Sequence, residues 1–473
     1  MPPKRERQLA FLLAAVFVLV FLCRGAERLG QRDLNDFHAY YKGALAFRSG
    51  GPLYEDREEP VFKYSPFFAL AFVPLTFLGE GTAFVVWIVL SIVQLFVILI
   101  WSRELLDAKV VGQLGPPRVW VYVCAFLPVL AFFISDMDHG QANTFTLFWA
   151  TGSLRQLQKG RPGRAGISLA AAILSKVGAV LFMPFLWVRG YRRAMLWSVA
   201  WVMLLSLLPW PFQGGPAGGL RCLRAWYIST GQRHDSDYLA SCTNQSLTGA
   251  FYRSFSRRER PFDVDHGFGG PLYVPSNELK RLQWLVGLLL YLVLLPRPRD
   301  SVLMERWRLK PSGVDFSLLM VVTTILFPMA WKYYYVSLLM PCMLVYLYLY
   351  RVGWRDPSVR NLFAAFIFLA VLMPYFPVRT WRLNALYYST MVWGALALVA
   401  ALWDIKRHPL RFTVTIIGVS AVVFTCGAAL FPFFMFYILT GPLRFIVQFI
   451  QHALHPKDKT VNDEESEMTS VDV

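Results

Sequence analysis

The sequence predicts an all-α polytopic membrane protein, and two observations support this prediction. Apolar residues make up 56 % of the 473-residue chain and charged residues only 16 %, whereas soluble domains carry about 25 % charged residues. The apolar residues also gather in long runs, and a helix crosses a membrane with about 20 of them. This composition excludes a disordered chain, a collagen-like chain and a small disulfide-rich secreted module.

Ten stretches are the main candidates for membrane spans: 9–23, 82–102, 119–134, 194–210, 282–296, 313–327, 336–350, 361–374, 384–403 and 412–429. Shorter or broken apolar stretches lie at 66–78, 142–154, 167–188 and 430–450. The span-length rule then predicts roughly 12–14 crossings. The first stretch follows three basic residues but precedes no small-residue cleavage site, so we expect a retained anchor rather than a signal peptide.

The formal net charge of +17 fits either a nucleic-acid surface or the topology of a membrane protein. Seven short segments hold 24 Lys and Arg against 7 Asp and Glu, which accounts for the whole net charge. These segments are 1–8, 103–118, 155–164, 189–193, 297–310, 351–360 and 404–411. The positive-inside rule places them in the cytoplasm, and little basic charge remains for a nucleic acid.

This charge distribution also predicts on which side of the membrane the other segments lie. We expect both chain ends in the cytoplasm and large outside loops at 24–64 and 211–280. Both ends of 165–190 are basic, which favours a hairpin that turns near 175–178; one continuous kinked span is the alternative and would invert everything downstream. Residues 1–451 are predicted as one membrane domain, and 452–473 as an acidic, disordered tail. Short outside loops are expected at 135–143, 328–335 and 375–383.

The first outside loop contains an acid at the start of an amphipathic helix. Asp33 and Asp36 precede Tyr40 and Tyr41, and the helical pattern ends near Arg48. An acid in a first helical turn also has a structural explanation, because it complements the helix dipole. For Asp33 we favour that explanation, whereas Asp36 becomes a functional candidate through the wider pattern.

The segment 135–143 places two carboxylates, an imidazole and two amides at a membrane boundary. The side chains are those of Asp136, Asp138, His139, Gln141 and Asn143. Ionisable groups at such a boundary are costly and indicate function, while a polar interfacial cap is the structural alternative.

Further polar side chains lie at three other places in the sequence. Lys176 lies in an apolar stretch, where it would either snorkel to the interface or meet an anionic headgroup. Asn244 and Gln245 precede Arg253, and arginine suits phosphate contacts. Lys332 stands between aromatic residues, Trp331 and Tyr333.

Cysteines and known cofactor motifs give little evidence about the function. Cys222 and Cys242 share an outside loop, where a disulfide is one open alternative. No Cys or His pair has zinc spacing, and Gly-rich phosphate loops are absent. We therefore expect neither a metal nor an organic cofactor.

Taken in order, these pieces resemble bacterial glycosyltransferase family 87, in the GT-C superfamily of polyprenyl-phosphate-sugar-dependent transferases. The matching pieces are the acidic-aromatic segment 36–41, the region 51–66, the Gly-Gln-x-Asn segment 140–143, the Lys segment 172–176 and 244–247 with Arg253. One departure concerns a His that family members often carry after the Trp of a Ser-Pro-x-x-Trp block. Here Lys332 follows Trp331, so Lys332 or Tyr333 would replace that His.

The resemblance implies a GT-C-like helix bundle with amphipathic helices on the outside. It implies an inverting transferase that moves a hexose, with mannose favoured, from a polyprenyl phosphate to a glycan or glycolipid hydroxyl. Its partners would be these two substrates and membrane lipids, and it would act on the outer face of the bacterial plasma membrane.

The resemblance also assigns roles to the candidate residues. Asp36 would be the general base, while Lys176, Arg253 and Lys332 would balance the donor phosphate. The candidates for binding sugar or acceptor are Tyr40, Tyr41, Asp138, His139, Gln141, Asn143, Asn244, Gln245, Trp331 and Tyr333. Two alternatives stay open: a transporter or flippase of lipid-linked sugars, and another GT-C transferase that acts on arabinofuranose, protein or lipid A.

Overall fold

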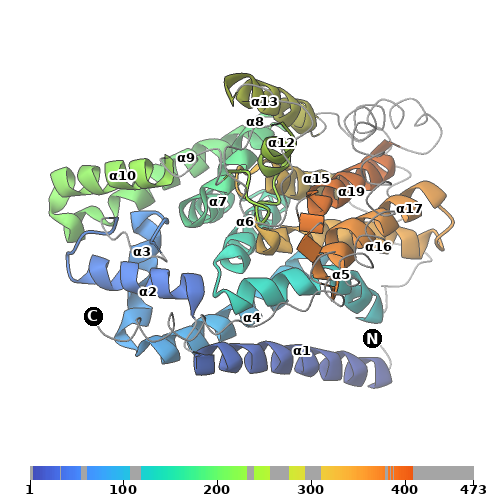
Figure 1. The fold of residues 1–473 in the computed structure, drawn as a ribbon, viewed down its shortest axis with the longest axis horizontal. Helices are drawn as coiled ribbons and strands as arrows, with labels where there is room; N and C mark the ends of the chain where they lie inside the picture. The colour runs from blue at the N-terminus through green and yellow to red at the C-terminus, as the bar shows by residue number, and fades with distance from the viewer. Residues whose placement is uncertain are drawn as a thin grey trace, which may run out of the picture. The chain divides into compact units, whose positions relative to one another are not determined.

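The computed structural model is built from helices, and the part of the chain that it describes contains no strand (Figure 1). It describes residues 4–31, 34–54, 61–106, 119–231, 239–255, 276–292, 294, 311–378, 382–383, 385–386 and 388–407. All of them lie in the compact unit Met1–Pro409. The predicted all-α membrane architecture is confirmed. The predicted tail and the stretches 412–429 and 430–450 lie outside the described residues.

The helices of the first half are α1 (Lys4–Gln31), α2 (Asn35–Arg48), α3 (Pro66–Phe72), η1 (Val73–Phe77), α4 (Glu80–Leu106), α5 (Val119–Asp138), α6 (Asn143–Gln158), α7 (Pro162–Ser175), η2 (Val177–Leu181), α8 (Phe182–Val188), α9 (Arg192–Leu207), η3 (Trp210–Gln213) and α10 (Gly215–Gly231). Those of the second half are α12 (Leu247–Phe255), α13 (Ser276–Leu292), α15 (Pro311–Leu326), η4 (Lys332–Leu338), α16 (Leu339–Arg351), α17 (Pro357–Phe366), η5 (Ile367–Leu372), η6 (Met373–Tyr375) and α19 (Thr390–Arg407).

Five stretches of helix in the described residues are long and apolar enough to cross a membrane. They are Glu80–Leu106, Trp120–Asp138, Arg192–Gln213, Lys332–Arg351 and Pro357–Tyr375. Each coincides with a stretch predicted from hydropathy. The apolar helices Pro66–Phe77, Val177–Val188 and Ser312–Leu326 are shorter, so the predicted total of crossings stays a prediction.

Proline and a side-chain cap set several of these boundaries. Ser65 accepts a hydrogen bond from the Phe68 amide at 3.2 Å, and Pro66 follows as the first residue of α3. Asp356 caps α17 in the same way, 3.1 Å from the Val359 amide. Proline suits the first helical turn because its missing N–H would have no partner there. The shorter apolar stretch 66–78 therefore forms two short helices, α3 and η1.

The basic segments of the sequence meet at one end of the helices. Gln158, at the end of α6, donates to the Leu105 carbonyl oxygen at 3.1 Å and to Ser312 Oγ at 2.8 Å. Beside them, Arg155 pairs with Glu104 at 2.6 Å. The last turn of α4, the last turn of α6 and the first turn of α15 therefore lie together.

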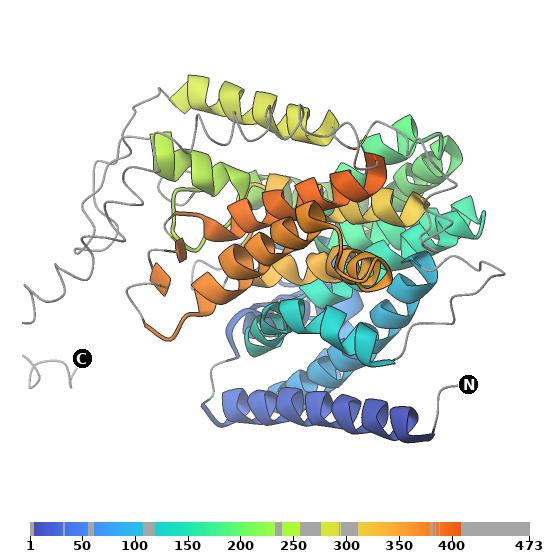
Figure 2. The same ribbon diagram turned by 90° about the vertical axis from the view of Figure 1, so that its right-hand side faces the viewer.

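A buried ion cluster extends this end to α8 and α19. Asp315 Oδ1 lies 2.6 Å from Arg189 Nη2 and 2.9 Å from Lys406 Nζ. Ser358 Oγ also lies 2.5 Å from Asp404 Oδ2, which joins the start of α17 to the end of α19. Figure 2 shows α17 and α19, in orange to red, packed side by side. We call this end of the helices the basic end.

Residues 162–188 leave the basic end and return to it. The far end of α7 is fixed where Ser175 Oγ lies 3.1 Å from Thr146 Oγ1, in the first turn of α6. The chain then turns at Lys176, and α8 runs back until Arg189 joins the buried cluster. This course matches the predicted hairpin and not one continuous span. It places Lys176 at the end of the helices opposite the basic end.

Candidate functional site

Helix α2 holds Asp36 in its first turn. Its buried face includes Phe37 and Tyr40, each with no exposed surface. The Phe37 ring packs edge-on against Phe72 and Phe84, with ring centres 5.6 and 5.2 Å away. This aromatic packing fixes the start of α2 against α3 and α4 and so fixes the backbone of Asp36.

A tight turn after α5 brings a second polar side chain to Asp36. Gly140 adopts a left-handed conformation, with φ of +59°, and its carbonyl accepts a hydrogen bond from Trp87 Nε1 at 3.1 Å. The next residue, Gln141, donates from Nε2 to Asp36 Oδ2. The turn thus connects α5 to the first turn of α2.

Glycine is required at this turn for two reasons, and we predict that Gly140→Ala destabilises the protein. A Cβ at residue 140 would lie 2.6 Å from Phe37 Cβ, and φ is positive there. Strained conformations of this kind cost about 1–3 kcal/mol before any clash is added. Thermal unfolding in detergent should show a lower midpoint for the variant.

Gly160 provides the matched control for this prediction. It also has a positive φ, +67°, but an added Cβ would meet nothing within 4 Å. Gly160→Ala should therefore show the backbone strain alone. Equal losses in the two variants would contradict the proposed contact between residue 140 and Phe37.

Lys176 connects the site residues. Its ammonium donates to Asn143 Oδ1 at 2.6 Å and to Gln141 Oε1 at 3.2 Å. It also lies 4.0 Å from the centre of the Tyr334 ring, within range of a cation–π interaction. Because Gln141 also donates to Asp36, one amide links the carboxylate to the cation.

Asp136 is a positioning residue that sequence reasoning left undecided. One of its oxygens accepts from Asn143 Nδ2 at 2.7 Å, and the other accepts from Thr144 Oγ1 at 2.6 Å and the Thr144 amide at 3.1 Å. The Asn143 amide group therefore has a fixed orientation, with its oxygen toward Lys176. The sequence signal that could have identified Asp136 was its position as a carboxylate at a predicted membrane boundary.

The two tyrosines of α2 have different surroundings. Tyr40 Oη lies 2.6 Å from Tyr64 Oη and 3.4 Å from Gln141 Oε1. Tyr40 is fully buried, so it supports the site through its hydroxyl and offers no exposed ring. Tyr41 instead donates to the Leu78 carbonyl at 2.7 Å and is not part of this cluster. Tyr64 lies in the matching region 51–66, but sequence reasoning did not identify it as a site residue.

Aromatic residues of the 328–335 segment complete the cluster. The Tyr333 ring centre lies 5.3 Å from that of His139, 5.5 Å from that of Trp331 and 5.9 Å from Lys176 Nζ. His139 itself is held through Nδ1, 2.8 Å from the Ser135 carbonyl oxygen. Three predicted residues, His139, Trp331 and Tyr333, thus lie together near Lys176.

The surroundings of Asp36 change the pKa of its carboxyl group. Burial raises the pKa of the Asp36 carboxyl above its ordinary value, while the nearby charges of Lys176, His139 and Lys63 oppose that rise. A carboxylate with a raised pKa binds a proton more readily than a solvated one. Asp36 is therefore a better base than an exposed aspartate.

Asn244 and Gln245 brace the chain behind this cluster. Asn244 Nδ2 donates to the Pro328 carbonyl at 3.0 Å, and its Oδ1 accepts from the Ala330 amide at 3.1 Å. Gln245 Nε2 donates to the Leu386 carbonyl at 2.7 Å. These buried amides fix the segment that leads to Trp331, and none of these hydrogen bonds reaches Asp36 or Lys176.

Arg253 lies in the same bracing region. It is 4 % exposed and donates to the Ser241 and Asn244 carbonyls and to Ser389 Oγ. These contacts hold α12 against the start of α19. The structure therefore does not join Arg253 to the Asp36–Lys176 cluster.

Asp138 and Lys332 lie beside the cluster. Asp138 forms a two-pronged ion pair with Arg24, with Nε–Oδ1 at 3.2 Å and Nη2–Oδ2 at 2.7 Å. Lys332 interacts electrostatically with Asp138, and its Nζ is 5.6 Å from the Tyr375 ring centre. Both residues directly adjoin members of the cluster, His139 and Tyr333, without being hydrogen-bonded to Asp36.

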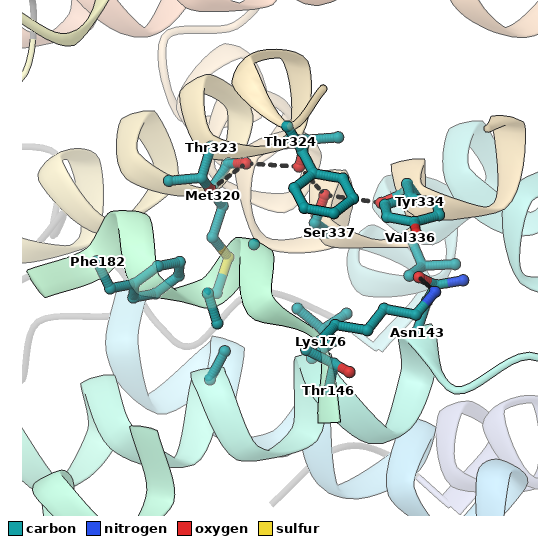
Figure 3. A pocket seen from close by; sticks show the side chains of 15 residues that line it. Asn143, Thr146, Lys176, Phe182, Met320, Thr323, Thr324, Tyr334, Val336 and Ser337 are labelled. Carbon is teal, nitrogen blue, oxygen red and sulfur yellow. Dashed lines mark hydrogen bonds between the residues drawn. The ribbon is translucent and has the colours of Figure 1, made fainter. Parts of the chain in front are cut away.

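A cavity of about 90 Å³ opens beside Lys176 (Figure 3). Its lining residues come from α6, η2, α8, α15 and η4. The apolar ones are Leu147, Ala150, Gly178, Ala179, Phe182, Met320, Phe327 and Val336, and the others are Asn143, Thr146, Lys176, Thr323, Thr324, Tyr334 and Ser337.

The threonine and serine hydroxyl groups of this cavity are already hydrogen-bonded. Thr146, Thr323 and Thr324 donate to carbonyls in the preceding helical turn, at 2.7 to 2.9 Å. Ser337 does the same at 3.1 Å. These groups therefore offer a ligand only lone pairs, and Lys176 is the charged group of an otherwise weakly polar wall.

The described residues contain no cluster of metal ligands and no disulfide between Cys222 and Cys242. No group of three or more His, Cys, Asp or Glu side chains there is placed to hold a metal ion. Cys222 and Cys242 are free thiols, so the alternative of a disulfide between them is not realised.

A comparison with known protein families adds an independent finding. The model of glycosyltransferase family 87 matches residues 62–328, more than half of the chain. The match includes Gln141, Asn143 and Lys176, whereas Asp36 precedes it. No curated protein matches the chain closely enough to count as a relative.

Proposed function

The chain belongs to glycosyltransferase family 87, and from this premise we propose that it transfers a hexose, with mannose favoured, from a polyprenyl phosphate. The acceptor is a hydroxyl group of a glycan or glycolipid, and the reaction inverts the anomeric carbon. The observation that carries the proposal is the weakly polar cavity ending at Lys176, which one amide, Gln141, links to Asp36.

The cavity suits the head of a lipid-linked donor. Its walls are mainly apolar and lie between α6, η2, α15 and η4, where an isoprenoid chain gains from leaving water. A phosphate at the end of that chain would meet the Lys176 ammonium. Lys176 has no carboxylate within ion-pair distance in the described residues, so its charge is available to balance the leaving phosphate.

Asp36 supplies the base. Gln141 donates to Oδ2, and Oδ1 accepts no hydrogen bond from the described part of the chain. Oδ1 is then the atom that takes the acceptor proton while the acceptor oxygen attacks the anomeric carbon. The bond from that carbon to the phosphate oxygen breaks, and the leaving phosphate carries the electron pair. A single displacement of this kind needs one carboxylate rather than the pair that glycosidases use.

The position of the site supports action on the outer face of the plasma membrane. Asp36, Gln141 and Lys176 lie at the end of the helices opposite the basic end, as the contacts of α6, α7 and α8 require. Because Lys- and Arg-rich loops stay in the cytoplasm, the basic end faces the cytoplasm and the site faces outward.

Reconstitution with defined donors tests this function. Purified protein in liposomes would receive polyprenyl-phosphate mannose, or another polyprenyl-phosphate sugar, together with a lipid extract as the source of acceptor. We expect a new glycosylated lipid, detected by mass spectrometry, and free polyprenyl phosphate. Movement of the donor across the bilayer without any glycosidic product would instead establish a flippase and refute the proposal.

A further inference from the structure

Three tyrosine rings surround the ammonium group of Lys176. Its Nζ lies 4.0 Å from the ring centre of Tyr334 and 5.9 Å from those of Tyr64 and Tyr333. A cation within about 6 Å of an aromatic ring centre is attracted to the negative face of the ring. All three distances fall in that range, and Tyr334 is the nearest of the three. We call these three residues the tyrosine cage.

The tyrosine cage adds to a set of uncharged partners for Lys176. Its two hydrogen-bond acceptors are amide oxygens, Asn143 Oδ1 at 2.6 Å and Gln141 Oε1 at 3.2 Å, and Figure 3 shows the lysine side chain extending to Asn143. A half-buried cation needs compensation for the water that it has lost. A carboxylate in contact with Lys176 would supply it, but would also cancel the charge that attracts an anionic ligand. Ring faces and amide oxygens stabilise the ammonium and leave its net charge in place.

Packing fixes the Tyr334 ring beside this ammonium. The ring stacks on Phe327, with ring centres 5.4 Å apart and planes 20° apart, and on Tyr333 at 5.7 Å and 28°. Phe327 in turn lies against Gly178, where an added Cβ would be only 2.8 Å from the Phe327 ring. Phe327 and Tyr334 both line the cavity next to Lys176. The position of the nearest ring is therefore determined by its neighbours and does not depend on a bound ligand.

Resting on the proposed transferase function, we propose that Tyr334 is a positioning residue whose ring face keeps the Lys176 ammonium charged and directed at the donor phosphate. Tyr64 and Tyr333 assist it from a greater distance. The face of the ring carries this role rather than the hydroxyl group, because the ammonium lies over the ring. Sequence reasoning selected Tyr333 for sugar or acceptor binding and did not select Tyr334, which gives the two adjacent tyrosines different roles.

Other charged or titratable groups also surround Lys176 and its neighbour Asp36, and each of them affects a measurement of pH dependence. These groups are Asp36 and Asp136, which attract the ammonium, and His139, Lys63, Tyr64 and Tyr333. A substitution of Tyr334 leaves all of them in place. A difference in pH dependence between variants at this position therefore reports on the Tyr334 ring.

Binding of farnesyl phosphate tests the tyrosine cage without requiring sugar transfer. This probe carries an isoprenoid chain and a phosphate, and its second pKa of about 6 leaves it fully charged above neutral pH. Its affinity should fall as rising pH removes the proton of Lys176. Because Tyr334→Leu removes the ring that stabilises the ammonium, this fall should begin at a lower pH. A tenfold loss of that stabilisation corresponds to a shift of about one pH unit.

Four variants serve as comparisons for Tyr334→Leu. Tyr334→Phe keeps the ring and should bind farnesyl phosphate like the wild type at every pH, whereas Tyr334→Met, a second variant without a ring, should behave like Tyr334→Leu. Tyr227→Leu removes a tyrosine of α10 that is 78 % exposed and should change nothing. In a Lys176→Met background, Tyr334→Leu should weaken binding no further, because the ring then has no cation to stabilise.

Three results would overturn the inference and leave the transferase function intact. Equal losses in Tyr334→Phe and Tyr334→Leu would show that the hydroxyl group matters and not the ring face. A loss of the same size at every pH would show that the ring only fills space. Additive losses from Tyr334→Leu and Lys176→Met would show that the ring acts independently of the cation. Equal affinity of the wild type for farnesol and farnesyl phosphate would instead refute the donor role of Lys176, and the inference with it.

Discussion

Replacing Asp36 with asparagine should abolish sugar transfer and leave the protein folded. Asparagine has the same shape but no basic oxygen, so the acceptor hydroxyl would keep its proton during attack. A positioned general base contributes about 10²–10⁴-fold to a rate, and a loss of that size is expected in kcat. Transfer of labelled sugar to lipid acceptor, measured with wild type and variant at equal protein amounts, gives the result.

Glu104→Gln is the matched control for this substitution. It makes the same change from carboxylate to amide at the basic end, in an exposed pair with Arg155. Exposed ion pairs contribute about 0–1 kcal/mol, so activity and thermal unfolding should both resemble the wild type. An Asp36→Asn protein that still transfers sugar at a normal rate would refute the role of Asp36 as base.

The meeting of basic segments at one end of the helices was predictable from the charge distribution alone. Seven basic segments were placed on one side of the membrane from the sequence. The contacts of Gln158, Asp315 and Ser358 show five of them meeting at the same end. The hairpin at 165–190 followed from the same reasoning, since it depends only on which side each end occupies. The exact number of membrane crossings was harder to predict, because it depends on apolar stretches whose lengths are ambiguous.

Part of the candidate site was predictable as a set of residues, whereas its arrangement was not. Asp138 was chosen as a site residue from the sequence, whereas Asp136 was left undecided. Two residues apart on a helix, they point about 200° away from each other, so Asp136 meets Asn143 while Asp138 meets Arg24. Only the orientation of α5 decides which carboxylate supports the site, and no local pattern encodes that orientation.

The Asn244–Gln245 pair illustrates a second limit. An amide side chain both donates and accepts, so the same residue suits a sugar hydroxyl or a backbone peptide group. In this structure both side chains bind carbonyls of other segments, at Pro328 and at Leu386. Sequence reasoning identified Asn244 and Gln245 as important. Their hydrogen bonds show that they hold other segments of the chain in place rather than a sugar.

Replacing Lys176 with methionine should lower kcat/KM for the lipid-linked donor by about 10²–10³-fold, the loss expected when one preorganised group that stabilises developing charge is removed. Methionine keeps much of the length and all of the apolar stem, so the cavity stays filled while the charge is lost. Removing the ammonium also leaves Asn143 Oδ1 and Gln141 Oε1 without their donor. Thermal unfolding must therefore be measured alongside activity at several donor concentrations.

Two further lysine variants decide which cation serves the donor. Lys159→Met removes an exposed lysine between α6 and α7, near Glu104, and should leave donor kinetics unchanged. Lys332→Met should change donor kinetics less than Lys176→Met does, because Lys332 does not line the cavity. If Lys176→Met keeps the donor KM and kcat of the wild type while Lys332→Met raises the donor KM, the donor phosphate binds Lys332 rather than Lys176. The cavity beside Lys176 would then need another ligand.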